Sequence, residues 1–315
     1  MNILVFGRDG QLGQALQKQF QSVLFQKGNN ILFVGRSECD LGYPSQITNL
    51  LEGFKPQLLI NAAAYTAVDQ AEKEPELAFA INAGAPEVMA VYAAHYGATL
   101  LHFSTDYVFD GSKQGAYTES DKISPLGVYG KSKEAGEHAI AKAFKTATEK
   151  SGQFAIFRTS WVYGDGRNFI RTILRLAKER SMLRVINDQY GVPTSAAWLA
   201  EVVCYLALNT NQLREFHSGI YHAVPRGETS WHALACLAVQ AALDDGQELQ
   251  ASLATIAPIP ASEYPMAAPR PMNSRLSTTR LQIELERLGL VSKLPHWNTP
   301  WDEQVVSYVK HLSKN

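Results

Sequence analysis

The chain has 315 residues, of which 46% are hydrophobic and 19% are charged, and its formal net charge is −1. This length and composition predict a globular protein of two domains, or of one large domain, with ample material for a hydrophobic core. The charge is nearly balanced and no block of Lys or Arg occurs, so electrostatics favour neither nucleic acid nor a membrane surface as a partner.

The cysteines and the N-terminus indicate a cytoplasmic protein. Cys39, Cys204 and Cys236 are scattered along the chain and fit no metal-ligand spacing, which is typical of a reducing compartment. Met1 leads directly into an apparent strand, without a basic segment or a cleavage site, and we expect no apolar run of membrane-spanning length. We therefore expect a cytoplasmic chain that binds no metal.

A strand, a glycine-rich turn and a helix open the chain. The apolar run Asn2–Phe6 predicts a buried parallel strand, and Gly7, Gly10 and Gly13 follow it before a helical pattern begins at Ala15. Glycines let the backbone approach a pyrophosphate, and the start of a helix offers free N–H groups with positive dipole character. A glycine cluster alone is more often a plain tight turn, but its position directly after a strand favours a dinucleotide-binding site.

The second predicted strand, residues 31–36, bears on the choice of cofactor. An acidic residue at the end of this strand holds the ribose of NAD in many dinucleotide folds, whereas an arginine accepts the extra phosphate of NADP. Val34 and Gly35 are not acidic, and Arg36 comes next. Arg36 is equally well explained as an ordinary surface residue. We expect NADPH to be preferred, with NADH as the alternative, and Asp40 and Leu41 to contact the adenine end.

Three more predicted strands, at residues 57–60, 99–103 and 154–158, alternate with predicted helices at residues 45–53 and 74–96. Such alternation predicts an α/β protein with a Rossmann-type, doubly wound parallel sheet. Asn82 faces inward on a helical count. The alanines of Asn61–Thr66 could admit a flat ligand or simply pack a helix, and Thr105 at a strand end could supply a hydroxyl or only cap a helix.

The stretch Ser124–Glu137 carries a second motif. Good helix formers predict a helix from Tyr129 to about Lys150, and positions four apart share a helix face, so Tyr129 and Lys133 project into the same space. An ammonium group favours a nearby phenolate, so we expect Lys133 to lower the pKa of Tyr129 towards that of a useful general acid. An accidental Tyr-x-x-x-Lys match is common, and alone it would indicate only a helix start.

Beyond the fifth strand the alternation loosens, which predicts a smaller, mostly C-terminal α/β substrate-binding domain. We expect residues 1–165 to bind the cofactor, residues 183–224 to return to that domain, and residues 166–182 and 225–315 to bind the substrate. Thr194 is expected to cap a helix that ends near Leu208. The turn-rich stretch Pro258–Arg275 is expected to line the substrate pocket, where Arg270 and Arg275 could grip a diphosphate or be solvated loop charges. The further elements expected here are helices at residues 168–180 and 231–243 and strands at residues 183–186 and 219–223.

Taken together, the glycine turn, the alanine stretch, Ser104-Thr105-Asp106 and the Tyr129/Lys133 pair resemble the extended short-chain dehydrogenase/reductase family. Within that family, long stretches resemble the reductases that act on dTDP-4-dehydro-L-rhamnose. These stretches are Asn61–Glu72, Ser104–Phe109, Val128–Lys133, Arg158–Tyr163, Val185–Thr194 and Arg270–Leu276.

The resemblance implies that NAD(P)H reduces the C4 keto group of this sugar nucleotide, in the last step of dTDP-L-rhamnose biosynthesis. Thr105, Tyr129 and Lys133 would be catalytic: Thr105 would bind the keto oxygen, Tyr129 would protonate it, and Lys133 would hold the nicotinamide ribose. The substrate-binding residues would be Thr105, Asp106, Trp161, Asn168, Arg270 and Asn273. The cofactor-binding residues would be Gly7, Gly10, Gln11, Leu12, Gly13, Arg36, Asp40, Leu41, Ala63, Ala64, Tyr65, Thr66, Phe103, Tyr129 and Lys133.

Two rival functions stay open. A nucleotide-sugar 4,6-dehydratase or a related epimerase shares the fold, but dehydratases typically follow the strand-end threonine with Asp-Glu, whereas Asp106-Tyr107 stands here. A non-catalytic regulatory subunit of the same fold is the second rival. Some members of the family form a metal-linked dimer through glutamates, where this chain has Ala15 and Trp198, so we expect a monomer or homodimer without metal.

Overall fold

A computed structural model describes residues 1–21, 28–147, 152–210, 212–264 and 266–313. A six-stranded sheet forms the larger part of the molecule, in the order β12-β5-β4-β3-β1-β2, and all its neighbouring strands run parallel. The order reverses between β1 and β3, which makes their carboxyl ends the switch point where ligands bind in such sheets. The strands are β1 (Asn2–Phe6), β2 (Asn30–Val34), β3 (Leu58–Asn61), β4 (Thr99–Thr105), β5 (Gln153–Thr159) and β12 (Gly219–His222). The predicted doubly wound α/β fold is confirmed.

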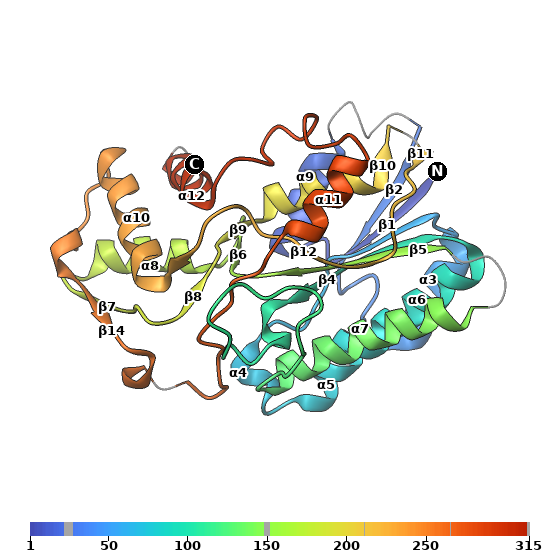
Figure 1. Cartoon of the computed structure of the whole chain (residues 1–315), viewed down its shortest axis with the longest axis horizontal. Coiled ribbons are helices and arrows are strands. Elements are labelled where there is room, and N and C mark those ends of the chain that lie inside the picture. The colour runs from blue at the N-terminus through green and yellow to red at the C-terminus, as the bar shows by residue number, and fades with distance from the viewer. Residues whose placement is uncertain (22–27, 148–151, 211, 265, 314–315) are drawn as a thin grey trace.

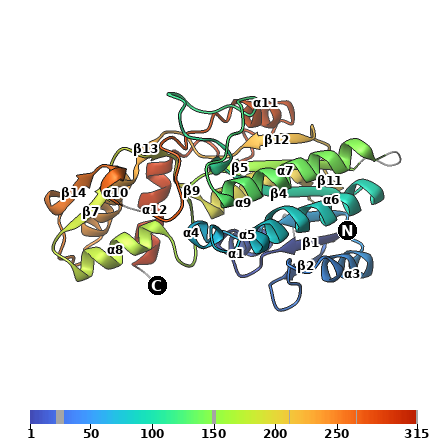
Figure 2. The ribbon, with the colours of Figure 1, turned by 90° about the horizontal axis from the view of Figure 1, so that it is seen from below.

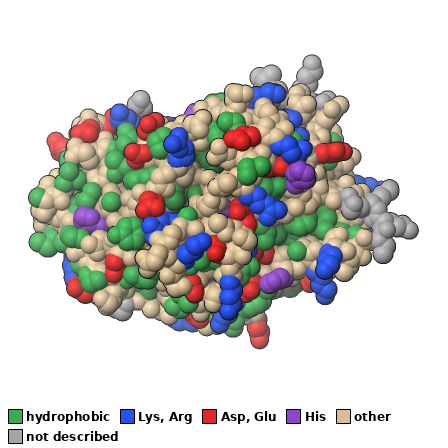
Figure 3. Space-filling model, viewed as in Figure 1, with side chains coloured by type: hydrophobic (Ala, Val, Ile, Leu, Met, Phe, Trp, Pro, Cys, Tyr) green, Lys and Arg blue, Asp and Glu red, His purple; other side chains and the backbone are tan. Residues whose placement is uncertain are grey.

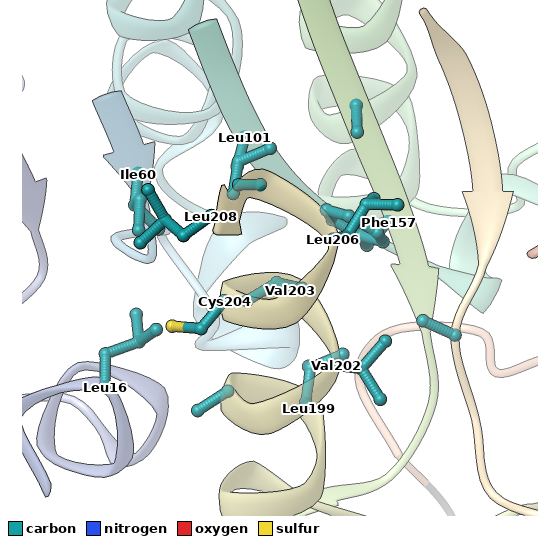
Figure 4. Packing of buried hydrophobic residues seen from close by; sticks show 14 of the residues in the cluster. Leu16, Ile60, Leu101, Phe157, Leu199, Val202, Val203, Cys204, Leu206 and Leu208 are labelled. Atoms are coloured by element: carbon teal, nitrogen blue, oxygen red, sulfur yellow. The ribbon is translucent and has the colours of Figure 1, made fainter. Parts of the chain in front are cut away.

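Helices cover both faces of the sheet, because its central strands are apolar on both sides. Ile3 and Val5 of β1 belong to one hydrophobic cluster, whereas Leu4 and Phe6 belong to the other. One face is covered by α1 (Gln11–Phe20), α9 (Ala196–Ala207) and α11 (Thr279–Arg287), and the other by α3 (Pro44–Phe54), α6 (Ala85–Tyr96) and α7 (Val128–Thr146) (Figure 1). Figure 4 shows the first cluster, in which Leu206 of α9 lies against Phe157 of β5 and Cys204 points toward Leu16 of α1. The sheet is thereby buried on both faces, as a parallel sheet requires.

One helical run is long and apolar. Residues 75–96 run continuously through α5 (Pro75–Phe79), a π-helical turn (Ala80–Gly84) and α6, and by length and composition alone this run could cross a membrane. The expectation that no run reaches that length is therefore wrong. Its buried residues, such as Met89 and Ala93, pack in the core on the sheet, and α6 lies beside α7 (Figure 2). Asn82 in the π-helical turn points inward as predicted and binds the hydroxyl of Ser132 at 3.0 Å.

A smaller cluster of elements lies to one side of the sheet (Figures 1 and 2). Helices α8 (Phe169–Glu179), α10 (Trp231–Asp244) and α12 (Trp301–Leu312) share its core, and the strands β7 (Leu183–Ile186) and β14 (Ile256–Ile259) pair in parallel at its edge. Short strand pairs join it to the larger part. They are β6 (Val162–Tyr163) with β9 (Thr194–Ser195), and β8 (Tyr190–Gly191) with β13 (Thr229–Ser230). The remaining elements are α4 (Val68–Ala71), the 3₁₀ turns η2 (Asp106–Val108), η3 (Leu253–Thr255) and η4 (Ala261–Glu263), and the strands β10 (Leu208–Asn209) and β11 (Gln212–Leu213).

Several local expectations differ from the structure. Thr194 does not cap a helix, because it lies in β9 with its hydroxyl donating to the carbonyl of Val192, and Ser195 takes the N-cap position of α9. The helix that begins near Tyr129 ends at Thr146, and the predicted end at Lys150 lies outside the described residues. The stretch Pro258–Arg275 is not all loop, because its first two residues complete β14.

Candidate active site

A cleft of about 550 Å³ opens at the carboxyl ends of β1 to β4. Of the 15 predicted cofactor-binding residues, all except Gly13 line this cleft. The sequence analysis missed several others on its wall. They are Phe6, Asp9, Val34, Gly35, Cys39, Ala62, Ala67, Ile81, Ser104, Thr159, Val162 and Leu199. Many of them follow from the fold, because they are neighbours of predicted residues at the same strand ends. Thr159 and Val162 lie in the stretch Arg158–Tyr163 that carries the family resemblance, whereas Leu199 of α9 carried no recognisable signal.

The glycine turn is shaped by close backbone contacts. Gly7 has φ 89°, and a Cβ there would lie 2.7 Å from backbone atoms of Ala62 and Ala63, so no other residue fits. A Cβ on Gly13 would lie 1.9 Å from the carbonyl oxygen of Gly7. Gly13 therefore lets α1 pack on the turn instead of facing the cleft, which explains why it is absent from the wall.

An acidic residue does lie at the end of β2, although it comes later in the chain than expected. The carboxylate of Glu38 accepts the backbone N–H of Gly35 at 2.9 Å and a bond from Nη1 of Arg8, also at 2.9 Å. The Gly35 N–H and the Arg8 guanidinium lower the pKa of Glu38. Arg36 is 76% exposed and binds Asp40 at 3.2 Å. The end of β2 thus has two arginines beside it, each with a carboxylate partner.

Asp9, the acidic residue within the glycine turn, has its carboxylate paired with Arg8 and not with the N-terminus of α1. Its carboxylate accepts a bond from Nε of Arg8 at 3.1 Å and is mostly exposed. The negative charge is thereby balanced at the rim of the cleft.

Thr105 lies close to Tyr129, which lines the cleft. Thr105 ends β4, Tyr129 lies in the first turn of α7, and the Thr105 hydroxyl acts on the phenol so as to lower its pKa. The Thr105 hydroxyl also donates to the carboxylate of Asp106 at 3.0 Å, and the ring of Tyr107 packs edge-on against that of Tyr129 at 5.5 Å. Burial raises the pKa of Tyr129 to about 12, and the Thr105 hydroxyl only partly offsets this. Burial likewise raises the pKa of Asp106 to about 6.

Lys133 lies one turn further along α7, with 1% of its surface exposed. Its Nζ donates to the carbonyl of Phe103 at 2.5 Å and lies 3.3 Å from Nε2 of His102. Burial lowers the pKa of Lys133 to about 8, against the opposing effect of Glu137. The expectation that Lys133 lowers the pKa of Tyr129 is wrong in this structure, because burial of the phenol dominates and the lysine is directed at β4.

The late-chain residues predicted to bind substrate are held by other protein groups. Asn168 caps α8 by accepting the N–H of Arg171 at 3.0 Å, and it donates to the hydroxyl of Tyr308 at 2.9 Å. The ring of Trp161 stacks on that of Trp231 with centroids 3.6 Å apart, and its backbone φ is 47°. Among the predicted substrate-binding residues, Thr105 and Asp106 lie close to Tyr129. For the others, the described residues show no contact with Tyr129 or Lys133.

The two arginines of the late loop are also paired. Arg270 forms two bonds to the carboxylate of Asp69, the shorter at 2.6 Å, and Arg275 binds Glu228 at 3.1 Å. Asn273 is buried and donates to the carbonyls of Lys113 and Gly115 at 2.6 and 2.8 Å. Binding of a diphosphate by Arg270 and Arg275 stays a prediction. It requires that both arginines leave their present carboxylate partners.

Comparison with known proteins agrees with this geometry. The family model of the RmlD substrate binding domain matches residues 1–312. The chain is 43% identical, over 304 residues and 94% of each chain, to dTDP-4-dehydrorhamnose reductase of Salmonella typhimurium.

The chain belongs to the RmlD substrate binding domain family. A solved dTDP-4-dehydrorhamnose reductase of Clostridium acetobutylicum has a TM-score of 0.82 and 32% identity, covering 99% of this chain and 100% of that one. The enzyme of the same name from Bacillus anthracis, solved in complex with NADP, has a TM-score of 0.81 and 30% identity, covering 100% and 99%. The match of this RmlD-family chain to its relatives therefore extends over both the sheet and the smaller cluster of elements.

Proposed function

We propose that this chain is a dTDP-4-dehydrorhamnose reductase, which uses NADPH or NADH to reduce the C4 keto group of dTDP-4-dehydro-L-rhamnose to dTDP-L-rhamnose. The observation that carries the proposal is the proximity of the Thr105 hydroxyl, at the end of β4, to the phenol of Tyr129, which lines the cleft. Two hydroxyls at one point can bind and protonate an oxygen on which negative charge develops.

The residues of the cleft fit a nicotinamide dinucleotide. The turn at Gly7 is a cradle that any Cβ would fill, and it precedes the N-terminus of α1, where free N–H groups suit a pyrophosphate. In the described part of the chain, the side-chain oxygens of Gln11 and Thr159 are buried at this cleft without a hydrogen-bond partner, so they can receive polar groups of a ligand. When bound, the cofactor supplies the hydride.

The chain's own residues supply the proton and the electrostatic support. Tyr129 is protonated at neutral pH because its pKa is high, so it donates a proton to the keto oxygen while Thr105 holds that oxygen by a hydrogen bond. Lys133 holds the nicotinamide ribose. Asp106, Trp161, Asn168, Arg270 and Asn273 bind the sugar or its diphosphate, once those residues that are paired within the protein exchange partners.

The two parts of the chain divide these tasks. We assign residues 1–165 and 187–224 to the cofactor-binding domain, since β12 completes the large sheet and α9 covers it. The strand Leu183–Ile186 pairs with β14, so its place is in the substrate-binding domain with residues 166–186 and 225–315, apart from α11, which returns to cover the large sheet. A cytoplasmic, metal-free monomer or homodimer is the corresponding working assembly. In the view of Figure 3, acidic and basic side chains are interspersed over the surface, which suits a small-molecule substrate better than nucleic acid.

The direct test is oxidation of NADPH or NADH by the purified chain with dTDP-4-dehydro-L-rhamnose. We expect turnover with this substrate and none with dTDP-glucose, which has no keto group. Lys133→Met is expected to lower kcat and cofactor affinity together, because it removes a charge near Tyr129 and a ribose contact. Cofactor binding without any turnover would favour the regulatory subunit, and loss of water from a dTDP-hexose without net oxidation of NADPH would favour the dehydratase.

A further inference from the structure

The turn Gly164–Asn168 joins β6 to α8, and its last side chain closes it. Nδ2 of Asn168 donates to the carbonyl of Gly164 at 2.8 Å, while Oδ1 accepts the backbone N–H of Arg171 at 3.0 Å. The side chain of Asn168 thus caps α8 and at the same time holds the two ends of the turn together. The turn and the start of α8 therefore form one hydrogen-bonded unit.

The hydroxyl of Tyr308 holds this unit from outside. Tyr308 lies in α12, the last helix, 144 residues from Gly164 along the chain. Its hydroxyl donates to the carbonyl of Gly164 at 2.6 Å and accepts Nδ2 of Asn168 and Nε of Arg171, each at 2.9 Å. A phenol hydroxyl has one proton to donate and two lone pairs. Every hydrogen bond that it can form is therefore made to the turn or to the start of α8.

On its other side the turn lies against Gln11, the first residue of α1. A Cβ placed on Gly164 would lie 3.5 Å from Cβ of Gln11, and one on Gly166 would lie 3.8 Å from its Cγ. A methyl group on either glycine would thus already touch the stem of the Gln11 side chain. Asp165 adds a second tie to the same helix, because it binds Nζ of Lys18 at 2.6 Å.

The amide of Gln11 ends in the cofactor cleft. Gln11 lines the cleft, and its Oε1 is buried without a hydrogen-bond partner among the described residues. A buried acceptor of this kind is costly unless a ligand supplies a donor. The pyrophosphate expected at the N-terminus of α1 has no donor, whereas the ribose on either side of it carries hydroxyl groups. Oε1 of Gln11 therefore suits a ribose hydroxyl of a dinucleotide.

We propose that Tyr308 is a positioning residue for cofactor binding: its hydroxyl holds the turn Gly164–Asn168 against Gln11, and this keeps Oε1 of Gln11 in place to accept a bond from a ribose hydroxyl of NADPH. The inference rests on the proposed function for the identity of the cofactor. Tyr308 is not among the described residues that line the cleft, so it acts through the turn. The last helix thereby supports a site that the first residues of the chain build.

Tyr308→Phe removes the hydroxyl and keeps the ring that packs against Tyr163, with centroids 5.0 Å apart. We expect the Kd for NADPH, titrated by its fluorescence with the purified chain, to rise about three- to ten-fold, as for the loss of one neutral hydrogen bond. Amide hydrogen exchange of residues 162–171 in the cofactor-free protein should become faster. An unchanged Kd would overturn the proposal.

Val305→Ala separates positioning from stability. Val305 lies in the same helix, is fully buried in the same core and has no hydrogen-bonding side chain. Removing its methyl groups lowers the stability of that core, but the Kd for NADPH should stay within about two-fold of the unmodified chain. If Val305→Ala weakens NADPH as much as Tyr308→Phe does, the role of Tyr308 is only structural and the proposal is rejected.

The unmodified chain supplies a measurement that depends on no variant. Binding of NADPH should slow amide hydrogen exchange in the turn Gly164–Asn168, because the bound ribose fixes Gln11 and Gln11 packs on the turn. Exchange of the turn that is the same with and without bound NADPH would contradict the proposal.

A double variant tests whether Tyr308 acts through Gln11. Gln11→Ala alone should also raise the Kd for NADPH about three- to ten-fold, and adding Tyr308→Phe to it should cost less than about two-fold more, because both changes remove the same contact. Losses that multiply would show that Tyr308 does not act through Gln11. If these binding results hold and NADPH is not oxidised with the dTDP-keto-sugar, the proposed function fails while the assignment of Tyr308 remains.

Discussion

At the scale of single residues, Tyr129 is a weaker acid in this structure than a free tyrosine. A raised pKa keeps the phenol protonated across the physiological range, which suits a group that must give a proton only when an alkoxide develops beside it. The nearby Thr105 hydroxyl lowers this pKa by less than burial raises it, so the phenol stays protonated. The Tyr-x-x-x-Lys spacing predicted that Tyr129 and Lys133 share a helix face, and both line the cleft, but it did not predict the raised pKa of Tyr129, since burial leaves no trace in the residue spacing.

Tyr129→Phe removes the proton donor and keeps the ring that packs against Tyr107. We expect kcat to fall by about 10²–10⁴-fold, which is roughly 3–5 kcal/mol of activation free energy, while the Kd for NADPH changes little. Steady-state kinetics and a binding titration measure the two effects. Tyr92→Phe, at a half-buried residue of α6 that does not line the cleft, is the matched control and should leave kcat unchanged. Turnover of Tyr129→Phe within a few-fold of the unmodified chain would contradict the role of Tyr129.

Arg36 lines the cleft near the end of β2, and Glu38 binds Arg8 there, so both residues are candidates for setting the cofactor preference. Arg36→Ala is expected to weaken binding of NADPH by about 1.5–3 kcal/mol, as for a charge-assisted hydrogen bond, and to leave NADH nearly unaffected. Glu38→Gln should act in the opposite direction, because it frees the Arg8 guanidinium for the extra phosphate. The test is to measure the Kd of NADPH and of NADH for the unmodified chain and for both variants. Equal losses for NADPH and NADH in Arg36→Ala would show that Arg36 does not read the phosphate.

At the scale of elements, α7 is fixed to the sheet by a buried ion pair. The guanidinium of Arg158 in β5 and the carboxylate of Glu137 in α7 are 0% and 3% exposed, and two bonds of 2.9 and 2.6 Å join them. Glu137 lies two turns from Tyr129, so this pair also fixes the rotation of the helix that presents the phenol and the lysine to the cleft.

Arg158→Met leaves the buried carboxylate of Glu137 without its counter-charge. We expect the free energy of unfolding to fall by about 3–5 kcal/mol, measured by urea denaturation. Arg175→Met breaks the exposed pair with Glu179 on α8 and should cost no more than about 0.5 kcal/mol. A similar small loss in both variants would show that the buried pair contributes no more than a surface pair.

The central strands and the cofactor cleft were predictable from the sequence, whereas the substrate side was not. Apolar runs such as Asn2–Phe6 are strands because they are buried on both faces, and a glycine cluster directly after such a strand is typical of a dinucleotide-binding turn. Asn168 and Arg270, by contrast, have side chains that serve a helix cap and an ion pair, which local sequence cannot distinguish from ligand binding. Glu38 was missed because its carboxylate reaches back three residues to the strand end.

At the scale of the whole molecule, acid should destabilise the fold through buried neutral histidines. Burial lowers the pKa of His222 to about 3, from an ordinary 6.5, and that of His102 well below 6.5. Between pH 6.5 and pH 3 the unfolded chain therefore binds more protons than the folded one, so stability falls as pH falls through this window. Asp106, whose pKa is raised to about 6, opposes this between pH 6 and pH 3.8.

We expect each buried histidine to contribute a slope of about 1.4 kcal/mol per pH unit within its window. Urea denaturation from pH 7 to pH 4 measures the slope, and His222→Gln should make it shallower. His138, exposed on α7, provides the control, since His138→Gln should leave the slope unchanged. A stability independent of pH above pH 4 would contradict the assignment of these histidines as neutral.

The late position of β12 and α11 in the chain affects how the protein folds during translation. The ribosome completes β1 to β5 early, but the sixth strand comes only at Gly219–His222, and the helix that carries Leu281 and Leu285 onto the same apolar face comes later still. Until that helix emerges, the face holding Leu16 and Leu101 lacks part of its cover. During this stage of translation the nascent protein exposes an apolar sheet face that is prone to aggregation. We therefore expect co-translational chaperones to bind this enzyme mainly before its final segment is made.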